Sequence, residues 1–257
     1  MNADALKQLR QTHAAGCQLL QRFNYKPESI GVAIEVEKNR WYWKPEQPKL
    51  ILVAESHVFT TEREFKFQLD ESKIRPFIKS KAALPPNHFT RFVYCLGYGE
   101  SESLIPEVPQ ISNMGTPTFW DIFGRVAFRC PQPRRDKGAN FKDRLRWKVD
   151  TLRELYRMGI WLLDASVHAI YRRNEARLPI GIQEKLHKQW WTGYGKYLVA
   201  SCGSPKVWVI GRMVHNCFSK LNFNDWHCDG WIYQPNATGF NLNHNWPRLL
   251  DDCGRLR

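Results

Sequence analysis

The chain has 257 residues, 43% of them hydrophobic, which is enough for one large domain with a substantial core and too little for two. Lysine and arginine outnumber aspartate and glutamate by 38 to 25, and the net charge of +13 favours a polyanionic partner such as nucleic acid over a merely basic soluble protein. The seven cysteines are scattered and contain no Cys-x-x-Cys pair, which argues against a disulfide framework and a zinc or iron-sulfur site.

From these properties we expect a single domain over residues 1–257, with a helical N-terminal extension over 1–45 and a core over 46–257. The N-terminal residues lack an apolar signal core, and no stretch approaches the length of a membrane span. We therefore expect a cytoplasmic monomer that binds no membrane, no metal and no cofactor.

In chain order, residues 4–23 show the apolar spacing of an amphipathic helix that packs against a sheet. Continuous apolar runs over 50–54, 92–96, 159–163 and 207–211 are typical of parallel strands buried on both faces. Helices are predicted after an N-cap at Thr116, over 145–156 and over 182–197. Strands that alternate with helices predict an α/β fold with a central, mostly parallel four-stranded sheet flanked by helices.

Ligands of an open parallel sheet bind where the carboxyl ends of the strands run into loops. Four of the expected strands end in segments with polar or flexible residues: 54–57, which contains Glu55 and His57; 95–100; 164–168, which contains Asp164 and His168; and 211–212. Two carboxylates and two histidines would then converge on one rim, which is more than a structural sheet requires.

The order of these segments resembles the uracil-DNA glycosylase superfamily, loosely from Lys49 to Gly239. Ala54-Glu55-Ser56-His57 stands where that family has Gly-Gln-Asp-Pro-Tyr or Gly-Glu-Ala-Pro-Gly, and 116–123 resembles its Pro-Pro-Ser-Leu-x-Asn-Ile segment. Residues 158–167 resemble the Gly-Val-Leu-Leu-Leu-Asn strand, 190–192 the Trp-x-x-Phe-Thr helix start, and 207–211 the strand that closes with Trp-Gly. The final His-Pro-Ser-Pro-Leu motif survives as Gln234-Pro235-Asn236-Ala237-Thr238, without its histidine. The resemblance implies a three-layer sandwich that flips a base and cleaves its glycosidic bond.

Two residues after the first strand are catalytic candidates. A carboxylate such as Glu55 can stabilise the oxocarbenium-like sugar or orient the attacking water. The alternative for Glu55 is a loop glutamate that pairs with a nearby arginine. His57 could hold Glu55 or the water, and its alternative is a loop histidine bonded to backbone.

Asp164 stands where the family's asparagine reads uracil, and we assign it both base recognition and catalysis. A carboxylate accepts hydrogen bonds from the exocyclic amine of cytosine, so the change favours a cytosine-like base over uracil. A protonated Asp164 could instead assist the departure of the base. The alternative without a catalytic role is an aspartate that caps the following turn.

Stacking partners and DNA contacts complete the expected site. Tyr94, Tyr98 and Phe119 are candidate platforms for the flipped base, although each could be an ordinary core residue. Candidate DNA contacts are Gln234, Asn236, Phe240 (as a wedge), Arg172, Arg173, Arg212 and His168.

The sequence therefore predicts a monofunctional DNA glycosylase that leaves an abasic site, because no lysine is placed for Schiff-base chemistry. Its expected substrate is a modified cytosine, such as glucosylated 5-hydroxymethylcytosine of phage DNA, which would make it an antiphage defence enzyme. The alternatives are a uracil or mismatch repair glycosylase and a DNA-binding module without catalysis. The residues leave open the base, the strandedness of the DNA and the biological role.

Overall fold

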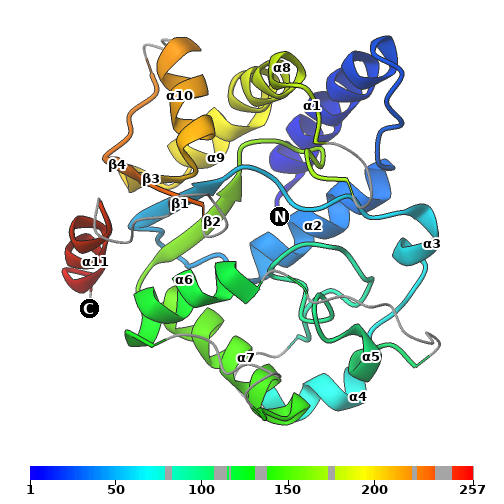
Figure 1. Ribbon diagram of the computed structural model, residues 1–257, viewed down its shortest axis with the longest axis vertical. Coiled ribbons are helices and arrows are strands. Elements are labelled where there is room, and N and C mark those ends of the chain that lie inside the picture. The colour runs from blue at the N-terminus through cyan, green and yellow to red at the C-terminus, as the bar shows by residue number, and fades with distance from the viewer. Residues whose placement is uncertain are drawn as a thin grey trace.

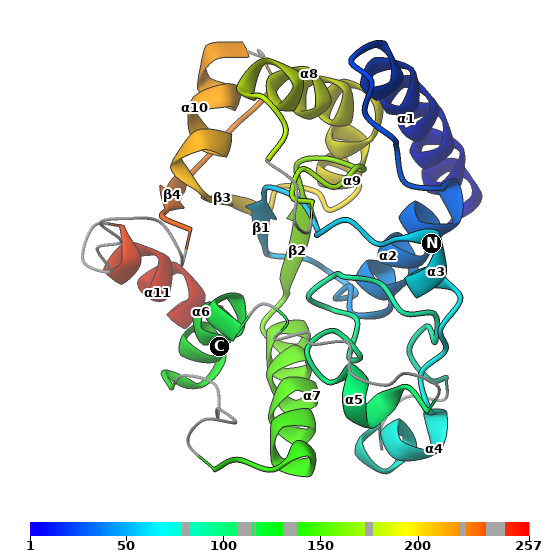
Figure 2. The same ribbon diagram turned by 45° about the vertical axis from the view of Figure 1, so that its right-hand side comes forward.

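The computed structural model describes residues 1–78, 83–106, 115, 117–130, 138–172, 177–221, 225–234 and 245–256. Figure 1 shows a central sheet with helices on both of its faces, and Figure 2 shows the same elements from a second side. The predicted α/β class with a four-stranded sheet flanked by helices is confirmed.

The sheet is parallel throughout, with strand order β2-β1-β3-β4. Its strands are β1 (Leu50–Ala54), β2 (Ile160–Asp164), β3 (Lys206–Ile210) and β4 (Gly230–Ile232). All residues of β1 and β2 are buried, as continuous apolar runs predict for strands covered on both faces. Ala54 pairs with Asp164, so the carboxyl ends of these two central strands lie side by side.

One predicted strand is wrong, and another was missed. Residues 92–96 form a series of turns rather than a strand, although their side chains are buried in the core. An apolar run of that length is compatible with a buried turn as well as with a strand, because the side chains of both are removed from water. The fourth strand is instead β4, whose three residues are too short to give a periodic signal.

The first half of the chain contributes helices α1 (Ala3–Arg22) and α2 (Ile30–Tyr42), then the short elements α3 (Glu62–Phe65), α4 (Glu71–Ile74), η1 (Arg75–Phe77) and α5 (Ser101–Leu104). The second half contributes α6 (Pro117–Phe128), α7 (Phe141–Arg157), α8 (Ile180–Trp190), the π-helical turn η3 (Trp191–Gly195), α9 (Lys196–Ala200), α10 (Arg212–Leu221) and α11 (Trp246–Gly254). The four predicted helices correspond to α1, α6, α7 and the continuous α8–η3–α9 segment. The predicted N-cap Thr116 lies outside the described residues.

Alternation along the strands divides the core into two layers. Leu50 and Leu52 of β1 face a cluster that contains side chains of α6, α7 and α11, whereas Ile51 and Val53 face a cluster with α1, η3, α9 and α10. The predicted packing of the N-terminal helix against the sheet is confirmed by Leu9, which belongs to the second cluster. Among the described residues, no helix has the length and apolar character needed to cross a membrane.

Candidate functional site

A chain of buried charges lies at the carboxyl ends of β1 and β2. Asp164, the last residue of β2, accepts a hydrogen bond from Arg40 of α2 at 2.7 Å. Its carboxylate also lies 3.6 Å from Nδ1 of His57, which follows β1. Arg40 pairs in addition with Glu37 one helical turn earlier, and all four side chains are at least nine-tenths buried. The resemblance pointed to Asp164 and His57, and the structure brings them together.

Glu28, from the segment between α1 and α2, anchors this chain of charges. Its carboxylate accepts a hydrogen bond from His57 Nε2 at 2.9 Å and from the backbone N–H groups of Thr60 at 2.7 Å and Ala169 at 3.0 Å. One buried side chain thus joins the loop after β1 to the loop after β2. Glu28 therefore holds the two loops together beside the strand ends, with His57 between Glu28 and Asp164.

His57 is a cation at neutral pH in this setting. Burial disfavours the charged ring. The attraction and hydrogen bond of Glu28, together with the nearby negative charge of Asp164, outweigh burial and raise the pKa of His57 to about 9. Burial likewise tends to raise the pKa of Glu28, but its contacts with His57 and the two backbone N–H groups lower it overall. The carboxylates of Glu28, Glu37 and Asp164 thus surround two buried cations, Arg40 and His57.

A small cavity of about 30 Å³ adjoins this chain of charges. It is lined by Ala54, Ser56, His57, Val58, Arg91, Phe92, Val93, Phe119, Leu162 and Asp164. The Nδ1 atom of His57 is buried and has no hydrogen-bond partner among the described residues, since 3.6 Å to Asp164 is too long for one. With His57 protonated, the cavity wall therefore contains an unsatisfied N–H donor beside a carboxylate.

Glu55 does not face Asp164 across this cavity, contrary to the expectation. Side chains alternate along a strand, so Glu55 points to the same face of the sheet as Ile51 and Val53. Asp164 pairs in register with Ala54 and points, like Ala54, to the opposite face. Glu55 pairs with Arg177 and accepts a 3.2 Å hydrogen bond from Gln234. The alternative reading, a glutamate that pairs with a nearby arginine, is what the structure shows.

The three candidate stacking residues occupy different environments. Phe119, near the start of α6, lines the cavity and is only partly buried. Tyr94 and Tyr98 are buried core residues outside the lining, and burial raises the pKa of the Tyr94 phenol. Phe119 is therefore the one of the three that the structure places against Asp164 and His57.

The expected DNA contacts are dispersed. Arg212 is exposed at the first residue of α10, and Arg172 donates to the Lys26 carbonyl with its guanidinium 4.6 Å from the centre of the Phe59 ring. Gln234 bridges Tyr171 and Glu55. Arg173, Asn236 and Phe240 lie outside the described residues.

His168 does not fit the expected role as a DNA contact, because it is 1% exposed and packs against α1. Its ring stacks on His13 at 4.5 Å, and with Cys17 these residues place three metal-ligating atoms within 4.8 Å of one another. Both histidines donate Nε2–H to backbone carbonyls, at 3.0 Å each. With both Nε2 atoms bonded to carbonyls, this cluster joins α1 to the loop after β2.

Sequence reasoning missed the two residues that organise the site, Glu28 and Arg40. Both precede the first strand, in the segment interpreted as an extension, and neither lies in a motif. A glutamate next to the helix N-cap Ser29 and an arginine near the end of a helix are ordinary sequence features. They acquire their role only because α2 and the segment before it pack against the carboxyl edge of the sheet, where Arg40 contacts Asp164 and Glu28 contacts His57.

Comparisons with family models, with curated proteins and with solved structures found no match to this chain.

Proposed function

We propose that this chain is a monofunctional DNA glycosylase that extrudes a modified cytosine and hydrolyses its bond to the sugar. The observation that carries the proposal is the cavity at the carboxyl ends of β1 and β2, where the Asp164 carboxylate, the unsatisfied Nδ1–H of His57 and the Phe119 ring meet. The motif resemblance to the uracil-DNA glycosylase superfamily and the net charge of +13 support the same reaction and substrate class. No lysine lines the described cavity, so the proposal includes no Schiff-base step.

Asp164 recognises the base in this proposal. Arg40 holds the carboxylate through Oδ2 at 2.7 Å, and among the described residues no hydrogen bond is made to Oδ1. Oδ1 can therefore accept a hydrogen bond from the exocyclic amine that cytosine has and uracil lacks. Phe119 stacks on the extruded ring, which contributes about 1–3 kcal/mol for an aromatic–base contact.

His57 assists the departure of the base. As the bond between the base nitrogen and C1′ breaks, its electron pair stays on the base, and the His57 imidazolium supplies a proton that neutralises the leaving group. Water forms the new bond to C1′, and the proton that it releases restores the imidazolium. A pKa of about 9 keeps His57 protonated at neutral pH, which suits it to a poor leaving group such as cytosine.

The volume of the cavity requires movement when the base enters. About 30 Å³ accommodates about one water molecule, whereas small-molecule sites typically measure about 300–1,000 Å³. Phe119 is the partly exposed aromatic side chain in the lining, so we expect its ring to swing outward and then close over the base.

A panel of duplexes tests the reaction. Purified protein is incubated with DNA that contains cytosine, 5-hydroxymethylcytosine, glucosylated 5-hydroxymethylcytosine or uracil, including phage genomes with these bases. Alkali-labile sites are scored, and the released base is identified by mass spectrometry. We expect release of a modified cytosine, consistent with antiphage defence. Equal or faster release of uracil would instead indicate a repair glycosylase, and DNA binding without any release would indicate a binding module.

Matched carboxylate-to-amide variants locate the chemistry. Asp164→Asn should lower turnover by about 10²–10³-fold and leave DNA affinity within a few-fold, because the base contact changes while the charged surface does not. Glu55→Gln is the control, since Glu55 is equally buried at the same sheet edge but pairs with Arg177 outside the cavity. An equal loss in both variants would contradict the assignment of the reaction to Asp164 and His57.

A further inference from the structure

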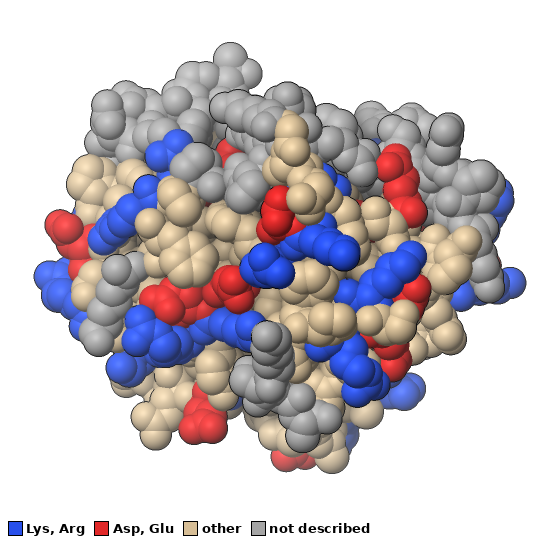
Figure 3. All heavy atoms as spheres, turned by 90° about the horizontal axis from the view of Figure 1, so that it is seen from below, with Lys and Arg blue, Asp and Glu red and all other residues tan. Residues whose placement is uncertain are grey.

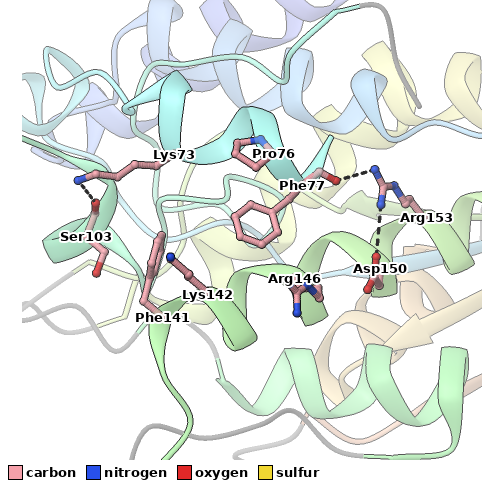
Figure 4. A pocket seen from close by; sticks show the side chains of 9 residues that line it. All are labelled: Lys73, Pro76, Phe77, Ser103, Phe141, Lys142, Arg146, Asp150 and Arg153. Atoms are coloured by element: carbon pink, nitrogen blue, oxygen red, sulfur yellow. Dashed lines mark hydrogen bonds and ion pairs between the residues drawn. The ribbon is translucent and has the colours of Figure 1, made fainter. Parts of the chain in front are cut away.

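A large basic groove lies on the molecule away from the cavity at the strand ends. Its volume is about 910 Å³, within the range of ligand-binding sites, and it shares no lining residue with the smaller cavity. Figure 4 shows η1 on one side of the groove and α7 on the other. The lining residues are Lys73, Pro76, Phe77, Ser103, Phe141, Lys142, Arg146, Asp150 and Arg153.

The positive charge of the groove comes largely from one face of α7. Lys142, Arg146 and Asp150 follow one another at intervals of four residues, so their side chains line the same wall of the groove. Asp150 is neutralised by Arg153 at 3.3 Å. Neither Lys142 nor Arg146 forms an ion pair with any residue that the structure describes, and both are exposed.

A third cation and the surrounding surface add to this potential. Lys73 of α4 donates to the Ser103 carbonyl at 2.8 Å and lies 3.6 Å from Asp70, so its charge is partly compensated. The α4 and α7 helices lie at the bottom of Figure 1, and the molecule seen from below has lysine and arginine side chains spread across its middle (Figure 3). Aspartate and glutamate side chains lie among them in the same view. Within the groove, a polyanion would therefore meet chiefly the charges of Lys142 and Arg146, with which no described carboxylate pairs.

Two aromatic rings line the groove together with these cations. Phe77 of η1 and Phe141 at the start of α7 are each partly buried, and the Arg146 guanidinium lies 5.8 Å from the centre of the Phe77 ring. Figure 4 shows Lys142 between the two rings. Cations that follow a backbone, beside aromatic faces on which bases stack, are the combination by which proteins hold single-stranded nucleic acid.

We propose that this groove binds a single strand of nucleic acid. Lys142 and Arg146 contact two phosphates, and the Phe141 ring stacks on an unpaired base. The inference goes beyond the glycosylase reaction, because binding here uses none of the residues of the cavity. It holds equally for an enzyme and for a module without catalysis.

A charge-reversal pair with a matched control tests the phosphate contacts. The double variant Lys142→Glu/Arg146→Glu is compared with Lys7→Glu/Arg10→Glu, which changes the net charge equally at exposed positions of α1. Binding to a fluorescein-labelled single-stranded oligonucleotide is measured by anisotropy over a range of salt concentrations, after thermal melts show that the variants are folded.

We expect the groove variant to bind at least about tenfold more weakly at 0.1 M salt than the wild type. The slope of log K against log salt should fall by about 1.4, since each phosphate contact on a single strand contributes about 0.7. The α1 control should stay within about threefold of the wild type. Equal weakening in both double variants, or no weakening in the groove variant, would overturn the proposal.

A second variant tests the stacking contact without changing charge. Phe141→Leu keeps an apolar side chain in the groove but removes the aromatic face, so oligonucleotide binding should weaken about five- to tenfold. Binding to heparin, a polyanion without bases, should be unchanged. An equal loss for heparin and for the oligonucleotide would overturn the stacking contact. Because Asp164→Asn should bind the oligonucleotide normally, failure of this inference and failure of the glycosylase proposal are distinguishable.

Discussion

At the scale of single residues, the site depends on charges that stabilise one another away from water. An isolated buried ion costs several kcal/mol, and removal of one partner of a buried pair typically costs about 3–5 kcal/mol. Glu28 is offset by His57 and two backbone N–H groups, and Asp164 is offset by Arg40 and His57. His57 lies between the two carboxylates, so its protonation depends on both.

Glu28→Gln should therefore lower the pKa of His57 from about 9, because attraction to Glu28 is the largest favourable contribution to its charged form. The ring resonances of His57 in an NMR titration report this pKa directly, without any assay of activity. Glu55→Gln is again the control, since Glu55 is directed to the other face of the sheet, where it pairs with Arg177 and Gln234. An unchanged titration of His57 in Glu28→Gln would refute the anchoring role of Glu28.

At the scale of elements, the turn between α7 and β2 sets the position of the strand that ends in Asp164. Gly159 lies in this turn with φ of +76°, and its carbonyl accepts a 2.8 Å hydrogen bond from the N–H of Lys49 just before β1. A Cβ atom at Gly159 would lie 3.2 Å from the Gln47 carbonyl and 3.0 Å from Lys49 Cγ. The turn thus joins the starts of the two central strands at a point where a side chain has little room.

Gly159→Ala should consequently destabilise the fold by about 2 kcal/mol, part from the left-handed backbone conformation and part from crowding. Gly138→Ala separates the two causes, because Gly138 also has a positive φ, +84°, but no heavy atom of the described residues lies within 4 Å of a Cβ there. We expect a loss of about 1 kcal/mol there, measured by urea denaturation. Equal losses at both positions would show that crowding at Gly159 is negligible.

At the scale of the whole molecule, buried histidines determine how stability depends on pH. His168 and His187 are buried and neutral, and burial lowers the pKa of each to about 4. Their unfolded forms bind protons near pH 6.5, so they destabilise the fold as pH falls from 6.5 toward 4. His57 acts in the opposite sense: its contribution is complete below pH 6.5 and is lost as pH rises toward 9.

The free energy of unfolding should therefore be greatest near pH 6.5. Each histidine contributes a limiting slope of about 1.4 kcal/mol per pH unit. His168 and His187 act on the acid side, the lowered pKa values of His13 and His215 act in the same direction, and His57 alone of these acts on the alkaline side. The acid limb should therefore be at least about twice as steep. Urea denaturation at half-unit intervals from pH 4.5 to pH 9 measures both limbs. A curve that is flat between pH 6.5 and pH 9 would contradict a cationic His57 in the folded state.

The sequence by itself determined the α/β class, three of the four strands and the helical segments α1, α6, α7 and α8–η3–α9, because burial on two faces and helical amphipathicity leave local periodic patterns. It did not predict α2, which carries Arg40. It also indicated Asp164, His57 and Phe119, which follow from position at a strand end or near a helix start. The apolar turns over 92–96 were misassigned because burial alone does not distinguish a strand from a compact loop.

Only the tertiary structure decided which charged groups meet. Glu28 and Arg40 reach His57 and Asp164 across 29 and 124 residues, and no local pattern encodes contacts over such separations. Glu55 follows β1 and Asp164 is the last residue of the neighbouring β2, yet the alternation of side chains directs them to opposite faces of the sheet. Strand ends can be located from sequence, but the partners of a buried charge depend on which distant elements cover it.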